Sequence, residues 1–146
     1  MNDGKDVYTL MNEIHLPPDS GVGEAGGRVS WSVRGIYQAY VGWFDMKPET
    51  MYETPVTAVY GDVVRLAGGP GGIVKLAQER IQSGKLVDAL HLTSIALAGD
   101  ASNRGALETR LKALELLQSA CQNGPEMGWL TYAVRETNKK LGSAAH

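Results

Sequence analysis

The segment from Val29 to Asp45, VSWSVRGIYQAYVGWFD, constrains the fold more than any other part of the chain. Its apolar residues recur with the 3.6-residue period of an amphipathic α-helix, namely Val33, Ile36, Tyr37, Tyr40, Val41 and Phe44. Ser30 or Ser32 is the expected N-cap, because a serine oxygen accepts a hydrogen bond from an otherwise unpaired backbone N–H. Pro48 follows closely, and proline disfavours helix in the residues before it. The pattern therefore predicts a helix that ends near Asp45.

This segment also carries half of the chain's ten aromatic residues, namely Trp31, Tyr37, Tyr40, Trp43 and Phe44. Aromatic side chains bury large areas and are enriched both in protein cores and at protein–protein interfaces. The helix is thus either the central core helix of a helical domain or a surface for a partner, and the two roles are compatible. These five aromatic residues are the candidate interface.

A short helix is expected before this segment, from Asp6 to Glu13, and Pro17-Pro18 end it. The following residues 19–28, DSGVGEAGGR, are polar and rich in glycine, which predicts a loop or a flexible arm. The first helix is then a segment on a tether. It packs on its own domain or reaches a partner chain.

The rest of the chain reads as a series of helices separated by turns. One helical turn is expected over residues 48–52, and Thr54-Pro55 predicts an N-cap followed by proline at the first helical position. Gly68-Gly69 end that helix. Further helices are expected over residues 70–83, 85–98, 104–122 and from 125 to about 141, the last with Trp129, Leu130, Ala133, Val134, Thr137 and Leu141 facing inward. Because strict apolar–polar alternation is absent, the predicted fold is all-α.

Residues 72–103 also fit a tetratricopeptide-type helix hairpin without gaps. Ala77 takes the small position of the first helix, Gly84 the turn, and Ala89 and Ala96 the close-packing positions of the second helix. Small residues at these points let two antiparallel helices approach closely. The sequence therefore predicts a helical bundle with a tetratricopeptide-like hairpin stack.

Composition excludes several classes of function. The 146 residues have a net charge of −2, which argues against a nucleic-acid partner, and no apolar run approaches the roughly 20 residues of a membrane span. The N-terminus is too polar for a signal peptide, so a cytoplasmic location is expected. The single cysteine, Cys121, excludes an internal disulfide.

Few residues of the sequence have the spacing or the neighbours that a catalytic or metal site requires. His15, His91 and His146 form no metal-binding spacing with one another, and no local base accompanies Cys121. The glycine runs follow no predicted strand and lack the ending of a phosphate-binding loop. We therefore expect no catalytic, cofactor-binding or metal-ligating residue, and no enzyme activity from this chain on its own.

The run from Tyr37 to Asp45, with Pro48 behind it, resembles the start of the dimerisation domain of alkyl sulfatases with a metallo-β-lactamase fold. A pattern close to Y-x-x-Y-x-G-W-F/Y-D-G-N-P marks that start. The resemblance extends over nearly the whole chain, through the link-like segment 6–18, the L-x-G-G helix end at residues 66–69 and the hairpin at residues 84–92.

Two positions depart from the family pattern. The usual Ser-His-Asn reads Ser30-Trp31-Ser32 here, and Met46-Lys47 stand where Gly-Asn is expected. The resemblance also implies that the zinc ligands of such enzymes lie in an upstream HxHxDH-bearing domain, no part of which is in this sequence. Zinc is then expected only in a partner catalytic domain, while the helical domain pairs two subunits and walls the active-site entrance.

Three functions follow for comparison. The first is a non-catalytic homodimerisation module with a helix and arm over residues 1–28, a dimerisation-like domain over 29–142 and a disordered tail over 143–146. The alternative is a C-terminal fragment or accessory subunit of a zinc-dependent alkyl sulfatase-like hydrolase, completing the active-site wall of a metallo-β-lactamase-fold partner. A tetratricopeptide-like peptide binder is the third, and the hairpin offers few Asn, Lys and Arg side chains for it.

Overall fold

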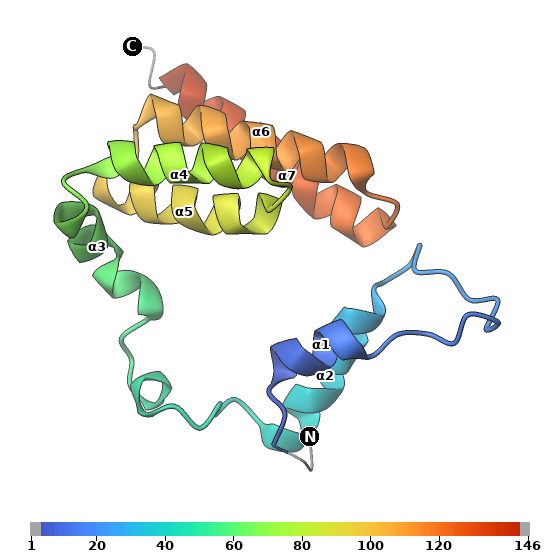
Figure 1. The fold of residues 1–146 in the computed structure, drawn as a ribbon. Helices are drawn as coiled ribbons and strands as arrows, with labels where there is room; N and C mark the ends of the chain where they lie inside the picture. Colours follow the sequence, from blue (N-terminus) through green and yellow to red (C-terminus); the bar gives the residue numbers. More distant parts are fainter. Residues whose placement is uncertain (1–3, 144–146) are drawn as a thin grey trace. The chain divides into compact units, whose positions relative to one another are not determined.

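The computed structural model describes residues 4–143, which are α-helical with short 3₁₀ turns and contain no β-strand over that range (Figure 1). The all-α prediction is confirmed. The chain divides into two compact units, one of Met1–Thr54 with Gln122–Met127 and one of Pro55–Cys121 with Gly128–His146. Of the tail expected over residues 143–146, all but Ser143 lies outside the described residues.

The first unit contains two helices, α1 (Val7–Glu13) and α2 (Val29–Val41), which pack on each other, and a 3₁₀ turn, η1 (Pro48–Met51). Asp6 is the N-cap of α1, where its carboxylate accepts hydrogen bonds from the backbone N–H groups of Tyr8 and Thr9. The Thr9 hydroxyl also donates to it and, as the largest cause, lowers the pKa of Asp6. The predictions for α1 and for the turn at Pro48 are confirmed to within one residue.

Both predicted ends of the aromatic helix are wrong. Its N-cap is Arg28 rather than Ser30 or Ser32, and the N–H of Val29 is satisfied by the Glu24 carboxylate at 2.6 Å, so no serine cap is needed. At the other end the helix stops at Gly42, which has a φ of 78°. Glycine adopts this left-handed region without the steric cost of a Cβ, so it ends the helix before Pro48 does.

The second unit is a helical bundle. It contains η2 (Val56–Val59), α3 (Tyr60–Leu66), α4 (Pro70–Gln82), α5 (Leu86–Gly99), α6 (Arg104–Ala120) and most of α7 (Gly124–Ser143). The helix predicted to start at Thr54-Pro55 begins instead as a 3₁₀ turn, with Pro55 extended and no side-chain cap. Its predicted end is confirmed, since Gly68 and Gly69 both have positive φ.

The core of the second unit is built around the hairpin of α4 and α5, with α6 packed against both helices. Ala77 and Ala89 are fully buried, as the close-packing prediction requires, and Ala113 of α6 joins the same cluster. Gly84 makes the turn with a φ of 74°. The kinship of this hairpin with tetratricopeptide repeats stays a prediction.

One expectation for α7 is wrong. Trp129 was expected inside, yet 74% of it is exposed, and its ring meets Tyr132 edge-on at 5.9 Å on the surface. Thr137 is buried as expected, and its hydroxyl bonds back to the carbonyl of Ala133. The periodicity therefore predicted the helix correctly, but it included Trp129 in the buried face although this residue lies on the exposed face.

Candidate association surface

No residue of α1 or α2 is buried, although both helices carry the apolar stripes that predicted them. On α2, the residues Val33, Tyr37 and Val41 are half-buried, with spacing of four, and α1 packs on this helix. Ile36 and Tyr40 form a neighbouring stripe that stays exposed. The single predicted face is therefore two stripes, and α1 covers only one of them.

Most of the exposed large apolar side chains of the first unit belong to what we call the α1–α2 surface, which leaves out Ile14, Leu16 and Val22 of the segment between the two helices. Its members are Tyr8, Trp31, Ile36, Tyr40, Trp43, Met46, Met51 and Tyr52. Three of the five candidate interface residues belong to it, with Tyr40 77%, Trp43 76% and Trp31 41% exposed. The other two, Tyr37 and Phe44, are half-buried within the unit. A concentration of large apolar groups in water marks an interaction site or an aggregation liability.

An apolar hollow lies at the end of α2. It has a volume of ≈ 270 Å³ and is lined by Val41, Gly42, Trp43, Phe44 and Met51. The rings of Trp43 and Phe44 are 5.7 Å apart and tilted by 59°. The shape offers a concave place for an apolar side chain beside an exposed indole.

Asp45 and Thr50 hold the loop that carries Trp43. The Asp45 carboxylate accepts hydrogen bonds from the Thr50 hydroxyl and from the N–H of Lys47, the latter at 3.2 Å. The Thr50 hydroxyl, as the largest cause, lowers the pKa of Asp45. The loop after α2 is therefore tied to the η1 turn.

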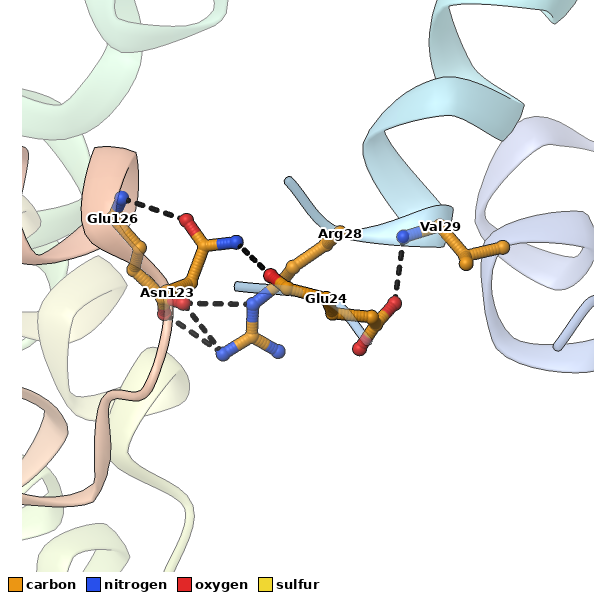
Figure 2. A network of polar contacts seen from close by, with 5 residues as sticks. All are labelled: Glu24, Arg28, Val29, Asn123 and Glu126. Carbon is orange, nitrogen blue, oxygen red and sulfur yellow. Dashed lines mark hydrogen bonds and ion pairs between the residues drawn. The ribbon is translucent and has the colours of Figure 1, made fainter. Parts of the chain in front are cut away.

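A polar network fixes the residues just before α2 to the turn before α7, as Figure 2 shows. Arg28 donates to both carboxylate oxygens of Glu126, from Nε at 2.8 Å and from Nη2 at 2.9 Å. The side-chain amide of Asn123 donates to the carbonyl oxygen of Glu24, and the backbone N–H of Gly124 donates to the carbonyl oxygen of Ala25. The last part of the glycine-rich segment is therefore held in place by residues almost a hundred positions away.

Asn123 has a second task in this network, because its Oδ1 accepts a hydrogen bond from the N–H of Glu126 at 3.0 Å. The helices expected over residues 104–122 and from residue 125 leave Asn123 between them, with no capping role assigned to it. The spacing Asn123 to Glu126 matches the Asn-x-x-Glu signature of a helix N-terminus, and that signal was available in the sequence. Asn123 is 5% exposed, so its polar atoms depend on protein partners.

We expect Asn123→Ala to lower the free energy of unfolding by about 0.5–2 kcal/mol, because the first turn of α7 loses its cap and the Glu24 carbonyl loses a donor. Urea denaturation followed by circular dichroism measures this loss. Asn138→Ala is the matched control, since Asn138 is an exposed asparagine of the same helix. Equal losses from the two variants would contradict the capping role.

The structure places no metal cluster among residues 4–143, since no three His, Cys, Asp or Glu side chains there come together to hold an ion. Within the same range no helix combines the length and apolarity that crossing a membrane requires.

The sequence profile described as "Alkyl sulfatase dimerisation" matches residues 10–140 of this chain. The chain belongs to this family. It is 27% identical to a linear primary-alkylsulfatase of Pseudomonas sp. (strain ATCC 19151), over 97% of this chain and 28% of that protein. It is 29% identical to an alkyl/aryl-sulfatase of Saccharomyces cerevisiae, over 62% of this chain and 14% of that protein.

Solved structures agree on the fold. A stereoselective inverting sec-alkylsulfatase from Pseudomonas sp. matches with a TM-score of 0.81 and 24% identity, covering 94% of this chain and 23% of that one. A double mutant of the sec-alkyl sulfatase PisA1 matches with a TM-score of 0.77 and 22% identity, over 97% and 23% of the two chains. The chain thus spans about a quarter of these proteins, and the family resemblance expected from the Tyr37–Asp45 motif is confirmed.

Proposed function

We propose that this chain associates with a second copy of itself through the α1–α2 surface and acts as a non-catalytic dimerisation module. One observation carries the proposal: two amphipathic helices with a dense aromatic load have no buried residue. Apolar area in contact with water is the main driving force for association. Tyr40 and Trp43 are of the residue types that dominate binding energy at interfaces.

The lengths of the two helices support the same conclusion. α1 has 7 residues and α2 has 13, and isolated helices shorter than about 12–15 residues are marginal in water. Their stability in proteins comes from packing of the apolar face, which here is half complete. A partner that covers the exposed stripe therefore stabilises the helices as well as the complex.

A second copy is the partner that best fits these observations. The family to which the chain belongs is described by dimerisation, and a two-fold interface lets one apolar patch cover its own equivalent. The net charge of −2 adds little repulsion between two copies. The hollow beside Trp43 offers a place for an apolar side chain of the other copy.

The alternative is a role inside a zinc-dependent alkyl sulfatase-like hydrolase, where this domain completes the active-site wall of a metallo-β-lactamase-fold partner. Its support is that the relatives are alkylsulfatases, of which the chain matches 28% or less. In that role zinc belongs to the catalytic partner. Zinc content and sulfatase activity, measured on the chain alone and after mixing with such a partner, separate the two proposals.

Light scattering across a dilution series tests the dimer. We expect a mass near twice 15.7 kDa at high protein concentration, falling toward the monomer mass on dilution. A helical, soluble monomer at every concentration would contradict self-association and favour the hydrolase partner.

A further inference from the structure

A second hollow, with a volume of ≈ 200 Å³, lies within the second unit between α5, α6 and α7. Its apolar lining includes Leu97, Leu107 and Tyr132, and its charged lining consists of Arg110, Glu136 and Lys140. Apolar walls with a few convergent polar groups are typical of sites for small ligands. The charges decide which ligands such a site accepts.

Arg110 is half-buried and has only neutral partners. Its Nη1 donates to the carbonyl oxygen of Leu90 at 3.2 Å and to the hydroxyls of Ser94 at 3.0 Å and Thr93 at 3.5 Å. No ion pair joins it to a carboxylate in the described range 4–143. Burial lowers the pKa of the Arg110 guanidinium, which is the mark of a charge removed from water without a compensating anion.

The bonds of Arg110 use one edge of the guanidinium and leave the other available. All three come from Nη1, so Nε and Nη2 have no protein partner among the described residues. These two atoms form the fork that binds a carboxylate or sulfate group through two parallel hydrogen bonds. Arg28 shows the fork in use, since its Nε and Nη2 grip both oxygens of Glu126. In Arg110 the hydrogen bonds to α5 orient the guanidinium, and no carboxylate of residues 4–143 pairs with its fork.

The three charged residues of the hollow, Arg110, Glu136 and Lys140, have a net positive charge. Lys140 forms no ion pair with any carboxylate of residues 4–143. Glu136 is already paired, with Lys139 Nζ at 2.7 Å and Arg135 Nε at 3.6 Å. The hydrogen bond from Lys139, as the largest cause, lowers the pKa of Glu136. Arg110 and Lys140 thus line the hollow without an ion-pair partner among residues 4–143, beside a carboxylate that two other cations neutralise.

We propose that this hollow binds a small organic oxyanion, a carboxylate or sulfate group on a short apolar chain. The Nε–Nη2 edge of Arg110 and the ammonium of Lys140 bind the oxygens. The walls formed by Leu97, Leu107 and Tyr132 receive the apolar chain. The volume suits a ligand of a few carbon atoms rather than a peptide, which requires an extended groove. The site is independent of the proposed dimerisation, because all its residues lie in the second unit.

Nuclear magnetic resonance titration of the ¹⁵N-labelled 146-residue chain tests the site with hexanoate, butyl sulfate, inorganic sulfate and hexylamine as probes. We expect saturable shifts of backbone amides around Leu97, Tyr132 and Thr137 with the two organic anions. Inorganic sulfate, which lacks the apolar chain, binds more weakly, and hexylamine causes no such shifts. Comparison of hexanoate with butyl sulfate tells which head group the fork prefers.

Substitutions of Arg110 and Lys140 distinguish the contribution of positive charge to ligand binding from that of the guanidinium geometry. Arg110→Gln is expected to weaken hexanoate binding at least tenfold, and Arg110→Lys to lie between it and wild type, because lysine keeps the charge but loses the fork. Lys140→Gln weakens binding severalfold. Arg104→Gln is the control and leaves binding unchanged, since Arg104 is an exposed residue of the same helix paired with Glu108.

Two results would overturn the proposal. One is the absence of saturable amide shifts with either organic anion. The other is equal hexanoate affinity in wild type and in a helical Arg110→Gln variant. If Arg110→Gln loses its helical circular dichroism, the Lys140→Gln variant provides the test, because Lys140 is exposed and its substitution leaves the fold intact. Unchanged hexanoate affinity in Lys140→Gln would then contradict the proposed site.

Discussion

The Gly99→Ala variant is expected to lower the free energy of unfolding by about 1–3 kcal/mol, the usual cost of forcing an extra methyl into a packed core. Gly99 is the last residue of α5 and lies against Val64 of α3. A Cβ at this position would stand 2.5 Å from Cγ1 of Val64, 3.0 Å from its Cβ and 3.1 Å from its Cγ2. Rotation of the valine cannot relieve all three contacts, so the helices themselves must shift.

The sign of this effect is informative because helix propensity acts in the opposite direction. Within a helix, alanine is favoured over glycine by about 1 kcal/mol. Gly72→Ala is the matched control, because Gly72 lies in α4 and an added Cβ there meets no atom within 4 Å. We expect that control to be as stable as wild type or more stable.

Urea denaturation curves of the three proteins decide the question. A Gly99→Ala variant as stable as Gly72→Ala would mean that α3 and α5 do not approach as closely as the structure has them. A loss confined to Gly99→Ala confirms that glycine is required there for close helix packing.

The features that could be predicted from the sequence are those with local causes. Asp6 and Asn103 cap the helices that follow them, as a short polar side chain before an apolar stripe predicts. Gly84 turns the chain because it alone in its neighbourhood adopts a positive φ at little cost. The family motif is local in the same sense, since it consists of nine consecutive residues, from Tyr37 to Asp45.

The features that escaped prediction have distant causes. The first backbone N–H of α2 donates to the Glu24 carboxylate in the preceding loop, and that loop is held through Arg28 by Glu126, 98 residues further along. A helix periodicity also cannot say which of two adjacent stripes a neighbouring helix covers. For this reason the five aromatic residues were identified together, while the division into exposed Tyr40 and half-buried Tyr37 required the structure.

The double substitution Tyr40→Ala with Trp43→Ala is expected to raise the dissociation constant of the proposed dimer at least 100-fold, about 2.7 kcal/mol or more. The two side chains are 77% and 76% exposed in the isolated chain, so their removal leaves no cavity in the core. Helical circular dichroism should therefore persist at protein concentrations where the wild type is dimeric. Light scattering across a dilution series measures the change in association.

Trp129→Ala is the matched control for this experiment, because Trp129 is 74% exposed but lies on α7 in the second unit. It removes an indole as exposed as that of Trp43 and leaves the α1–α2 surface unaltered, so we expect an unchanged dissociation constant. If Trp129→Ala abolishes the dimer and the double variant does not, association occurs through α7 and the proposed surface is wrong. If only the double variant dissociates, the dimer depends on the exposed stripe that α1 leaves uncovered.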